Sequence, residues 1–307
     1  MNDVVCVGIL VADVIARPVD APPAPGTLAF VDTVVLRGGG CALNTASALV
    51  HLGLRAAVIG KLGADAFGDA ICDLMAKRGV DRGAVLRDST VQTSVSVVLV
   101  DSFGERTFLH ARGANATLRA DELGEAPFAG RALHLGGTLV LDALDGEPAA
   151  SLLEDARRRG LHTSLDTVFA GGAGWDRVVP ALPHCDLVTP GLQEALAITG
   201  EGDPAAAARA LRELGAGTAV VTLGANGCYV ASDDFAGHVE ACRVHAVDGT
   251  GAGDAFAAGF LYGALAGWPT ERSARFASAA GALATRAVGA YEGVGDLEQT
   301  LELAGLH

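Results

Sequence analysis

The sequence predicts an α/β protein in which a doubly wound, mostly parallel central sheet is flanked by helices. Short continuous apolar runs, such as residues 4–10, 56–60 and 132–137, recur along the chain. Runs of this kind are typical of strands that are buried on both faces. Helical stretches follow several of the runs, which indicates βα units. Half of the 307 residues are hydrophobic, so the chain can bury a large core. We predict a single domain over residues 1–307.

Composition and charge exclude several classes of partner. The formal net charge of −14 argues against nucleic acid and anionic membranes. The six cysteines show neither a C-x-x-C pair nor metal-ligand spacing, so we interpret them as free thiols in a reducing compartment. The N-terminus lacks the basic region of a signal peptide, and no apolar segment approaches the ~18 residues of a membrane span. We therefore expect a cytoplasmic protein.

The first apolar run, residues 4–10, is predicted to be a buried strand, and Asp13 comes just past its end. In open α/β sheets, ligands bind beyond the carboxyl ends of the strands. Asp13 is therefore a candidate ligand-binding residue, and the alternative is an ordinary turn residue.

Two segments interrupt the βα pattern. The first is a Pro-rich loop that leads into a candidate strand over residues 30–36. The second contains the runs 93–100 and 106–109, joined by a D-x-x-G turn, and is predicted to be a β-hairpin.

A triple glycine, residues 38–40, precedes a helix predicted over residues 45–52. Glycines at this point allow close approach of the backbone to a ligand. Asn44 offers a neutral amide beside them, which suits recognition of hydroxyl groups. The alternative is that Asn44 only caps the start of the helix.

The stretch D-G-T-G-A-G-D-A-F-A-A-G-F, residues 248–260, combines a glycine-rich loop with a helix start. Unpaired N–H groups and the helix dipole make such a junction an anion site, most often for phosphate. Asp254 would repel a phosphate, so we interpret it as a base that takes a proton from an attacking hydroxyl.

Other interpretations of this stretch remain. Asp254 could simply cap its helix. The loop could be a dinucleotide-binding turn, G-x-G-x-x-G, but its sixth position is Asp254 and it lies late in the chain. A P-loop is excluded, because no G-x-x-x-x-G-K-[ST] occurs.

The whole stretch resembles the C-terminal signature of the ribokinase family, the PfkB-type carbohydrate kinases. The resemblance implies a ribokinase-like fold with a small β-lid, formed by segments of about 14–37 and 91–112. It implies an ATP-dependent kinase that transfers the γ-phosphoryl group to a hydroxyl of a sugar or sugar-like molecule. Asp254 would be the general base. The N–H groups of Gly251, Ala252 and Gly253 would hold the charge on the transferred group.

Further motifs match the family in order. Gly39, Gly40 and Asn44 fit G-G-x-x-x-N, which with Asp13 would hold the acceptor. Ribokinase itself has Lys-Gly after the glycine pair, where this chain has Cys41 and Ala42. For Arg112, the choice lies between a carboxylate or phosphate of the acceptor and a solvated surface position.

The nucleotide side carries weaker matches. The segment V-T-L-G-A-N-G resembles V-T-x-G-x-x-G, and the C-terminal helix has Ser278 where the family often has Asn. In the motif N-x-x-E, Glu194 is present but Gly191 replaces the Asn. The resemblance implies Mg²⁺ with Glu194 in its outer shell, and Asp248 is a candidate for a monovalent cation such as K⁺. The implied nucleotide-binding residues are Glu194, Thr222, Gly224, Gly227, Gly251, Gly253 and Ser278.

Three further readings stay open at this point. They are a nucleoside kinase of the same fold, a non-catalytic sugar or nucleotide sensor, and a nucleotide-dependent oxidoreductase. The expected partners are ATP and a small sugar-like acceptor. A homodimer is also expected, because the apolar hairpin would otherwise leave a bare sheet face.

Overall fold

The structure, a computed structural model, describes residues 2–168 and 174–306. Eight of the described strands form the main sheet, and all neighbours from β12 (Thr218–Thr222) to β4 (Ala56–Ile59) pair in parallel, which confirms the predicted fold class. The last two strands add an antiparallel hairpin at one edge. In spatial order the strands are β14 (Ala236–Val239), β13 (Cys228–Ala231), β12 (Thr218–Thr222), β11 (Leu187–Val188), β10 (His162–Thr167), β9 (Ala132–Thr138), β1 (Val4–Gly8) and β4 (Ala56–Ile59).

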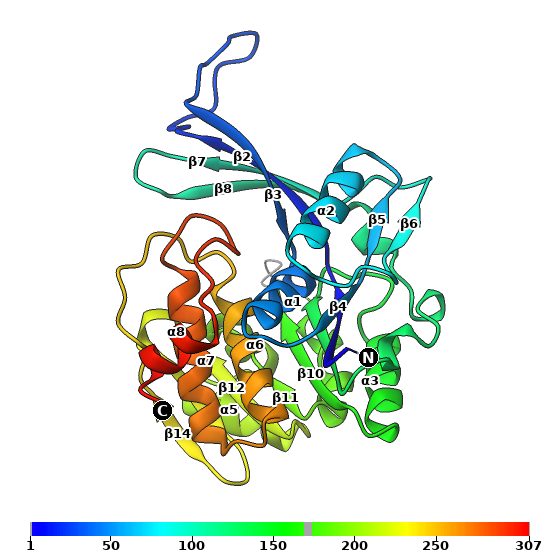
Figure 1. The fold of residues 1–307 in the computed structure, drawn as a ribbon, viewed down its shortest axis with the longest axis vertical. Helices are drawn as coiled ribbons and strands as arrows, with labels where there is room; N and C mark the ends of the chain where they lie inside the picture. The colour runs from blue at the N-terminus through cyan, green and yellow to red at the C-terminus, as the bar shows by residue number, and fades with distance from the viewer. Residues whose placement is uncertain (1, 169–173, 307) are drawn as a thin grey trace.

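Helices cover both faces of this sheet, as Figure 1 shows. Both faces need cover because the side chains of the sheet are apolar on both sides. In strand β1 they alternate between two core layers. Val5 and Val7 belong to one layer, and Val4 and Cys6 to the other. The first layer includes residues of α3 (Glu147–Arg158), α4 (Leu192–Thr199) and α5 (Pro204–Glu213). The second includes residues of α1 (Cys41–His51), α2 (Ala66–Lys77), α6 (Ala252–Leu265) and α7 (Thr270–Ala284), with α8 (Leu297–Ala304) packed against α7.

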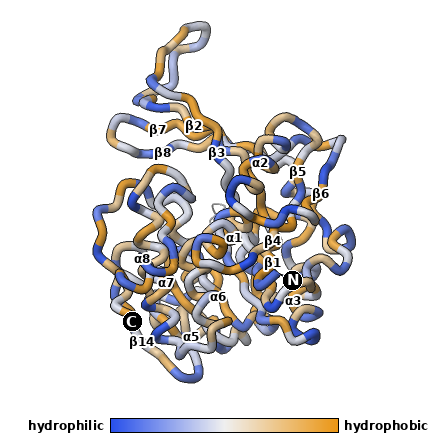
Figure 2. Tube along the Cα trace, viewed as in Figure 1, coloured by the Kyte–Doolittle hydropathy of each residue, from blue (hydrophilic) through white to orange (hydrophobic). Residues whose placement is uncertain are grey.

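A second sheet of four strands rises from this body (Figure 1). It contains the predicted hairpin, with its turn at Asp101–Gly104. We call this sheet the lid. In Figure 2 its strands β2 (Val11–Arg17) and β7 (Val95–Val100) carry hydrophobic residues although they lie away from the body. The order is β3 (Thr33–Gly39), β2 (Val11–Arg17), β7 (Val95–Val100) and β8 (Arg106–Ala111); a separate pair is β5 (Lys61–Gly63) with β6 (Leu86–Asp88).

The start of the chain differs from the prediction. Strand β1 covers only residues 4–8 of the apolar run 4–10, and the chain then enters the lid sheet as strand β2, which begins at Val11. Asp13 therefore lies inside a lid strand and not in a turn. Helix α1 also begins earlier than predicted, at Cys41 directly after Gly40. An unbroken apolar run gives no information about the point at which the chain leaves one sheet for another.

Candidate active site

The glycine-rich loop enters α6 at Gly251, which has φ 75°. This left-handed conformation favours glycine, and a Cβ here would come within 2.7 Å of Ala290. Apart from its chain neighbours and the backbone of its own helix, a Cβ at Gly253 would meet no atom of the described residues within 4 Å. The first turn of α6 therefore borders open space, toward which its N–H groups and dipole favour an anion. We call residues 248–253 the anion loop.

Asp254 lies in the first turn of α6 and is 8% exposed. Its carboxylate does not cap its own helix. Instead it accepts a hydrogen bond of 2.8 Å from Nδ2 of Asn44, in the first turn of α1. Thr45 Oγ1 donates to the Asp254 carbonyl at 3.4 Å. The tertiary structure thus joins the two glycine-preceded helix starts that the sequence singled out.

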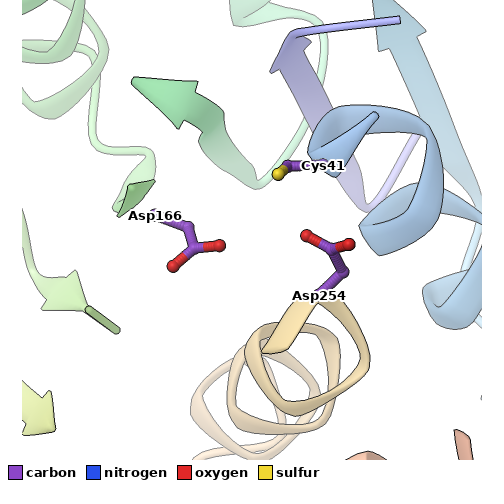
Figure 3. Close-up of side chains that lie close together, drawn as sticks. All are labelled: Cys41, Asp166 and Asp254. Atoms are coloured by element: carbon purple, nitrogen blue, oxygen red, sulfur yellow. The ribbon is translucent and has the colours of Figure 1, made fainter. Parts of the chain in front are cut away.

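Two further groups approach Asp254. Cys41 opens α1, Asp166 lies near the carboxyl end of β10, and their ligand atoms and a carboxylate oxygen of Asp254 lie within 4.8 Å of one another. Figure 3 shows the three side chains pointing toward a common space from three different elements. Cys41 and Asp166 are not among the site residues predicted from the sequence. The position of Asp166 near the carboxyl end of a parallel strand was the available indication.

Burial and mutual repulsion dominate the electrostatics of this cluster. Burial raises the pKa of Asp254 to about 6, although hydrogen bonds from Asn44 and Cys41 oppose the shift. Burial, then the charges of Asp254 and Glu194, hold the pKa of Asp166 well above its usual range. The pKa of the Cys41 thiol is raised in the same way. A carboxyl with a pKa near neutrality can act as a proton acceptor.

Glu194 lies near the same space, at the start of α4. Its Oε2 accepts hydrogen bonds from Thr167 Oγ1 at 2.8 Å and from the N–H of Gly191 at 2.6 Å. Gly191 stands where the family motif has Asn, and its N–H, not a side-chain amide, orients the carboxylate. A Cβ at Gly191 would lie 3.3 Å from Oε2.

Asp13 is held against the glycines before α1. A Cβ at Gly39 would come within 2.2 Å of its carboxylate, and a Cβ at Gly40 within 2.3 Å of the Ile9 carbonyl. Only glycine permits both approaches. Burial raises the pKa of Asp13 to about 6, partly offset by a hydrogen bond from Ser96.

Asp13 faces a cavity of about 800 Å³ between the lid and the body. The strand register explains the lining, because Arg37, Asp13 and Ser96 lie side by side in one row of the lid. A neighbouring row on the same face ends with Phe108. This inner face of the lid contributes Asp13, Ile15, Arg17, Arg37, Val98, Val100, Arg106 and Phe108 to the cavity.

A second cavity, of about 570 Å³, lies on the other side of the anion loop. Gly249 lines both cavities. Apolar residues of the 241–246 segment, α6 and α7 form much of its wall. The predicted nucleotide residues that line it are Thr222, Gly224, Gly227, Gly253 and Ser278.

Two predicted residues lie elsewhere. Arg112 follows the last lid strand and forms an ion pair of 2.6 Å with Asp142, with half of its side chain exposed. It lines neither cavity. Asp248 faces the first cavity, but its carboxylate is paired with Arg106 at 2.7 Å.

Known proteins are similar to this chain in sequence and in fold. The pattern of the pfkB family carbohydrate kinases matches residues 1–296. A fructokinase from Klebsiella pneumoniae is 33% identical over 285 residues, which cover 86% of this chain and 91% of that protein.

Two solved structures are similar over nearly the whole chain. The ribokinase of Thermotoga maritima superposes with a TM-score of 0.84 at 23% identity, over 99% of this chain and all of that one. The fructokinase of Xylella fastidiosa, solved with bound ATP, has a TM-score of 0.83 at 25% identity, covering 99% and 98%.

In the described part of the chain, no helix combines the length and the apolar character needed to cross a membrane. The cavities, the anion loop and the buried carboxylate agree with the family match. The chain belongs to the pfkB family of carbohydrate kinases and is an ATP-dependent sugar kinase.

Proposed function

We propose that this kinase transfers the γ-phosphoryl group of ATP to a hydroxyl of a ketohexose, with fructose as the first acceptor to test. One observation carries the proposal: the anion loop borders both cavities, and the buried carboxylate of Asp254 follows the loop directly, in the first turn of α6. ATP would occupy the apolar cavity and the sugar the cavity under the lid. The choice of fructose follows from the similarity to fructokinases.

In the proposed reaction, Asp254 accepts the proton of the attacking hydroxyl. The N–H groups of Gly251, Ala252 and Gly253 stabilise the charge on the transferred phosphoryl group. Asp13 and Asn44 hold the acceptor. Asn44 has the chemistry for two tasks, because its Nδ2 orients the base while its buried Oδ1 has no hydrogen-bond partner. A sugar hydroxyl would satisfy that oxygen.

The residues present also fit Mg²⁺. Asp166 and Glu194 are both acidic. The nearby charges that act on Asp166 are the carboxylates of Asp254 and Glu194, and Glu194 also acts on Asp254. Carboxylate oxygens suit this cation. We propose that Asp166 and Glu194 hold it, Glu194 through water, and that when bound it supplies positive charge to the nucleotide phosphates.

We propose that residues 1–307 form one kinase unit whose lid corresponds to the predicted segments 14–37 and 91–112. Six unpaired cysteines support a cytoplasmic, reducing location. The substrate role of Arg112 stays a prediction.

A panel of acceptors tests the proposed function. ADP release would be measured with fructose, ribose, a keto-deoxy sugar acid and a nucleoside, each at saturating ATP. We expect turnover with fructose above the others. Faster turnover of the nucleoside would support the nucleoside kinase instead. ATP binding without turnover of any acceptor would support a sensor.

The raised pKa of Asp254 predicts how the rate depends on pH. The base is active when deprotonated, so kcat should fall as the pH drops through about 6 and should level off above it. Asp13 also has a raised pKa of about 6, but it acts on acceptor binding. The Asp13→Asn variant, which lacks this carboxylate, should therefore still show the decrease of kcat at low pH. A kcat that stays constant between pH 5 and 7 would contradict the role of Asp254.

We also propose that the outer face of the lid pairs with a second copy of this chain. The register places Val34, Ala16 and Leu99 in one outer row, and Leu36, Val14, Val97 and Leu109 in the next. Val34 is 62% exposed and Leu109 63%. An uncovered apolar sheet face of this kind is typical of an interface.

The double change Val34→Glu and Leu109→Glu should convert a dimer to a monomer, because charges on a buried interface are strongly unfavourable. Sedimentation velocity would measure the change. Phe67→Glu, an exposed apolar position outside the lid, is the matched control. A wild-type protein that sediments as a monomer at all concentrations would rule the pairing out.

A further inference from the structure

Arg106 connects the lid to the anion loop. It is the first residue of β8 and belongs to the inner face of the lid. Its Nη1 lies 2.7 Å from Oδ1 of Asp248 and contacts Oγ1 of Thr250. The side chains of Arg106 and Asp248 are 31% and 12% exposed. The pair is therefore partly shielded from water, where an ion pair is stronger than on an open surface.

Both oxygens of the Asp248 carboxylate accept hydrogen bonds. Besides Arg106, Oδ1 accepts the N–H of Thr250 at 2.9 Å and its hydroxyl at 2.7 Å. Oδ2 accepts the N–H of Gly289 at 2.9 Å. Burial raises the pKa of Asp248, but these hydrogen bonds and the charge of Arg106 outweigh it and keep the pKa below its usual range. The carboxylate is thus a charged anchor.

The anchor holds two loops in place beside the phosphate site. Through Thr250 it fixes the anion loop, and through Gly289 it fixes the loop after α7. The two loops also meet at Gly251, whose backbone lies against Ala290. A bare carboxylate at this point would repel the ATP phosphates, so the loop needs a positive charge next to Asp248.

The sequence made Asp248 a candidate for a monovalent cation, and the described residues around it do not fit one. The position that a cation would occupy beside Oδ1 holds the Arg106 guanidinium. A guanidinium keeps its charge at any working pH and forms directed hydrogen bonds. It provides both the charge and the geometry that a bound ion would otherwise supply.

We propose that Arg106 is a built-in cation of the anion loop: it replaces a monovalent ion at Asp248 and fastens the lid to the phosphate site. The inference rests on the proposed function of the anion loop. Arg106 is then a positioning residue, because it acts through the anion loop, and the wild-type kinase does not depend on K⁺. Because Arg106 also lines the acceptor cavity, closure of the lid and order in the anion loop are coupled.

The test compares cations at constant ionic strength. The wild type should have the same kcat in potassium, sodium and tetramethylammonium chloride. Arg106→Ala should lose up to about 10²-fold in kcat in tetramethylammonium, the scale of a misplaced reacting group. Potassium should restore part of that loss, because it can now occupy the site at Asp248. Arg106→Lys should retain more activity than Arg106→Ala in tetramethylammonium.

Arg37→Ala is the matched control. It removes another ion pair between lid and body, that of Arg37 with Glu292 at 3.0 Å, without touching Asp248. This variant should gain no dependence on potassium. If it gains the same dependence as Arg106→Ala, the effect belongs to the lid in general and the proposal is wrong.

A measurement without turnover separates this proposal from the proposed function. In thermal unfolding without substrates, potassium should raise the Tm of Arg106→Ala above its value in tetramethylammonium, since a ligand of the folded state stabilises it. The wild type should show no such difference. Potassium activation of the wild type, or an Arg106→Ala variant without a potassium effect on rate or Tm, would overturn the proposal. Failure of every acceptor with the wild type would count against the proposed function alone.

Discussion

Asp254→Asn should lower kcat by about 10²–10⁴-fold, the usual contribution of a general base. An alcohol is a poor nucleophile at neutral pH, so its proton must leave as the bond to phosphorus forms. Asparagine keeps the shape and can still accept the hydrogen bond from Asn44 Nδ2, but it cannot take the proton. The Kd for ATP should stay the same or fall, since a negative charge beside the phosphates is removed. Steady-state kinetics and ATP titration measure the two quantities separately.

A folding control belongs with this variant. Because burial raises the pKa of Asp254 above that of an unfolded carboxyl, its ionisation at pH 8 disfavours the folded state. Asp254→Asn removes this cost, so its Tm at pH 8 should be no lower than that of the wild type. A lower Tm with loss of ATP binding would show a structural role. Turnover within a few-fold of the wild type would place the base elsewhere.

Asp13→Ala should weaken use of the acceptor and leave the KM for ATP unchanged. The half-buried carboxylate is placed to accept sugar hydroxyls, and its removal leaves those groups without a partner at a cost of about 1–3 kcal/mol. This corresponds to about 5–150-fold in kcat/KM for the acceptor. Fixed-ATP kinetics with varied acceptor would measure it.

Asp32→Ala is the matched control for Asp13. Asp32 is an exposed carboxylate that lines the same cavity, so its removal should change kcat/KM little. Asp13→Asn should lose less than Asp13→Ala, because the amide oxygen can still accept a hydrogen bond. An acceptor KM and a kcat that are unchanged in Asp13→Ala would remove Asp13 from the acceptor site.

The sequence alone was sufficient for features that depend on neighbouring residues. Apolar runs predicted the parallel sheet, and the D-x-x-G turn predicted the hairpin, because strand burial and turn geometry are local properties. The glycines before α6 predicted an anion loop with Asp254 behind it, since a helix start is defined within a few residues. The sheet, the hairpin and the start of α6 after the glycines are present in the structure, whereas anion binding by this loop stays a prediction.

Only the tertiary structure decided which distant residues meet. Cys41, Asp166 and Asp254 come from three elements, and sheet order, not spacing along the chain, brings them within 4.8 Å of one another. Arg106, on the lid strand β8, meets Asp248 of the anion loop, whereas Arg112 is paired with Asp142 and lines neither cavity. Hydrophobic periodicity specifies which face of an element is buried, but it does not specify which polar side chains at the ends of the elements will face each other. That choice depends on how the two core layers and the lid pack together.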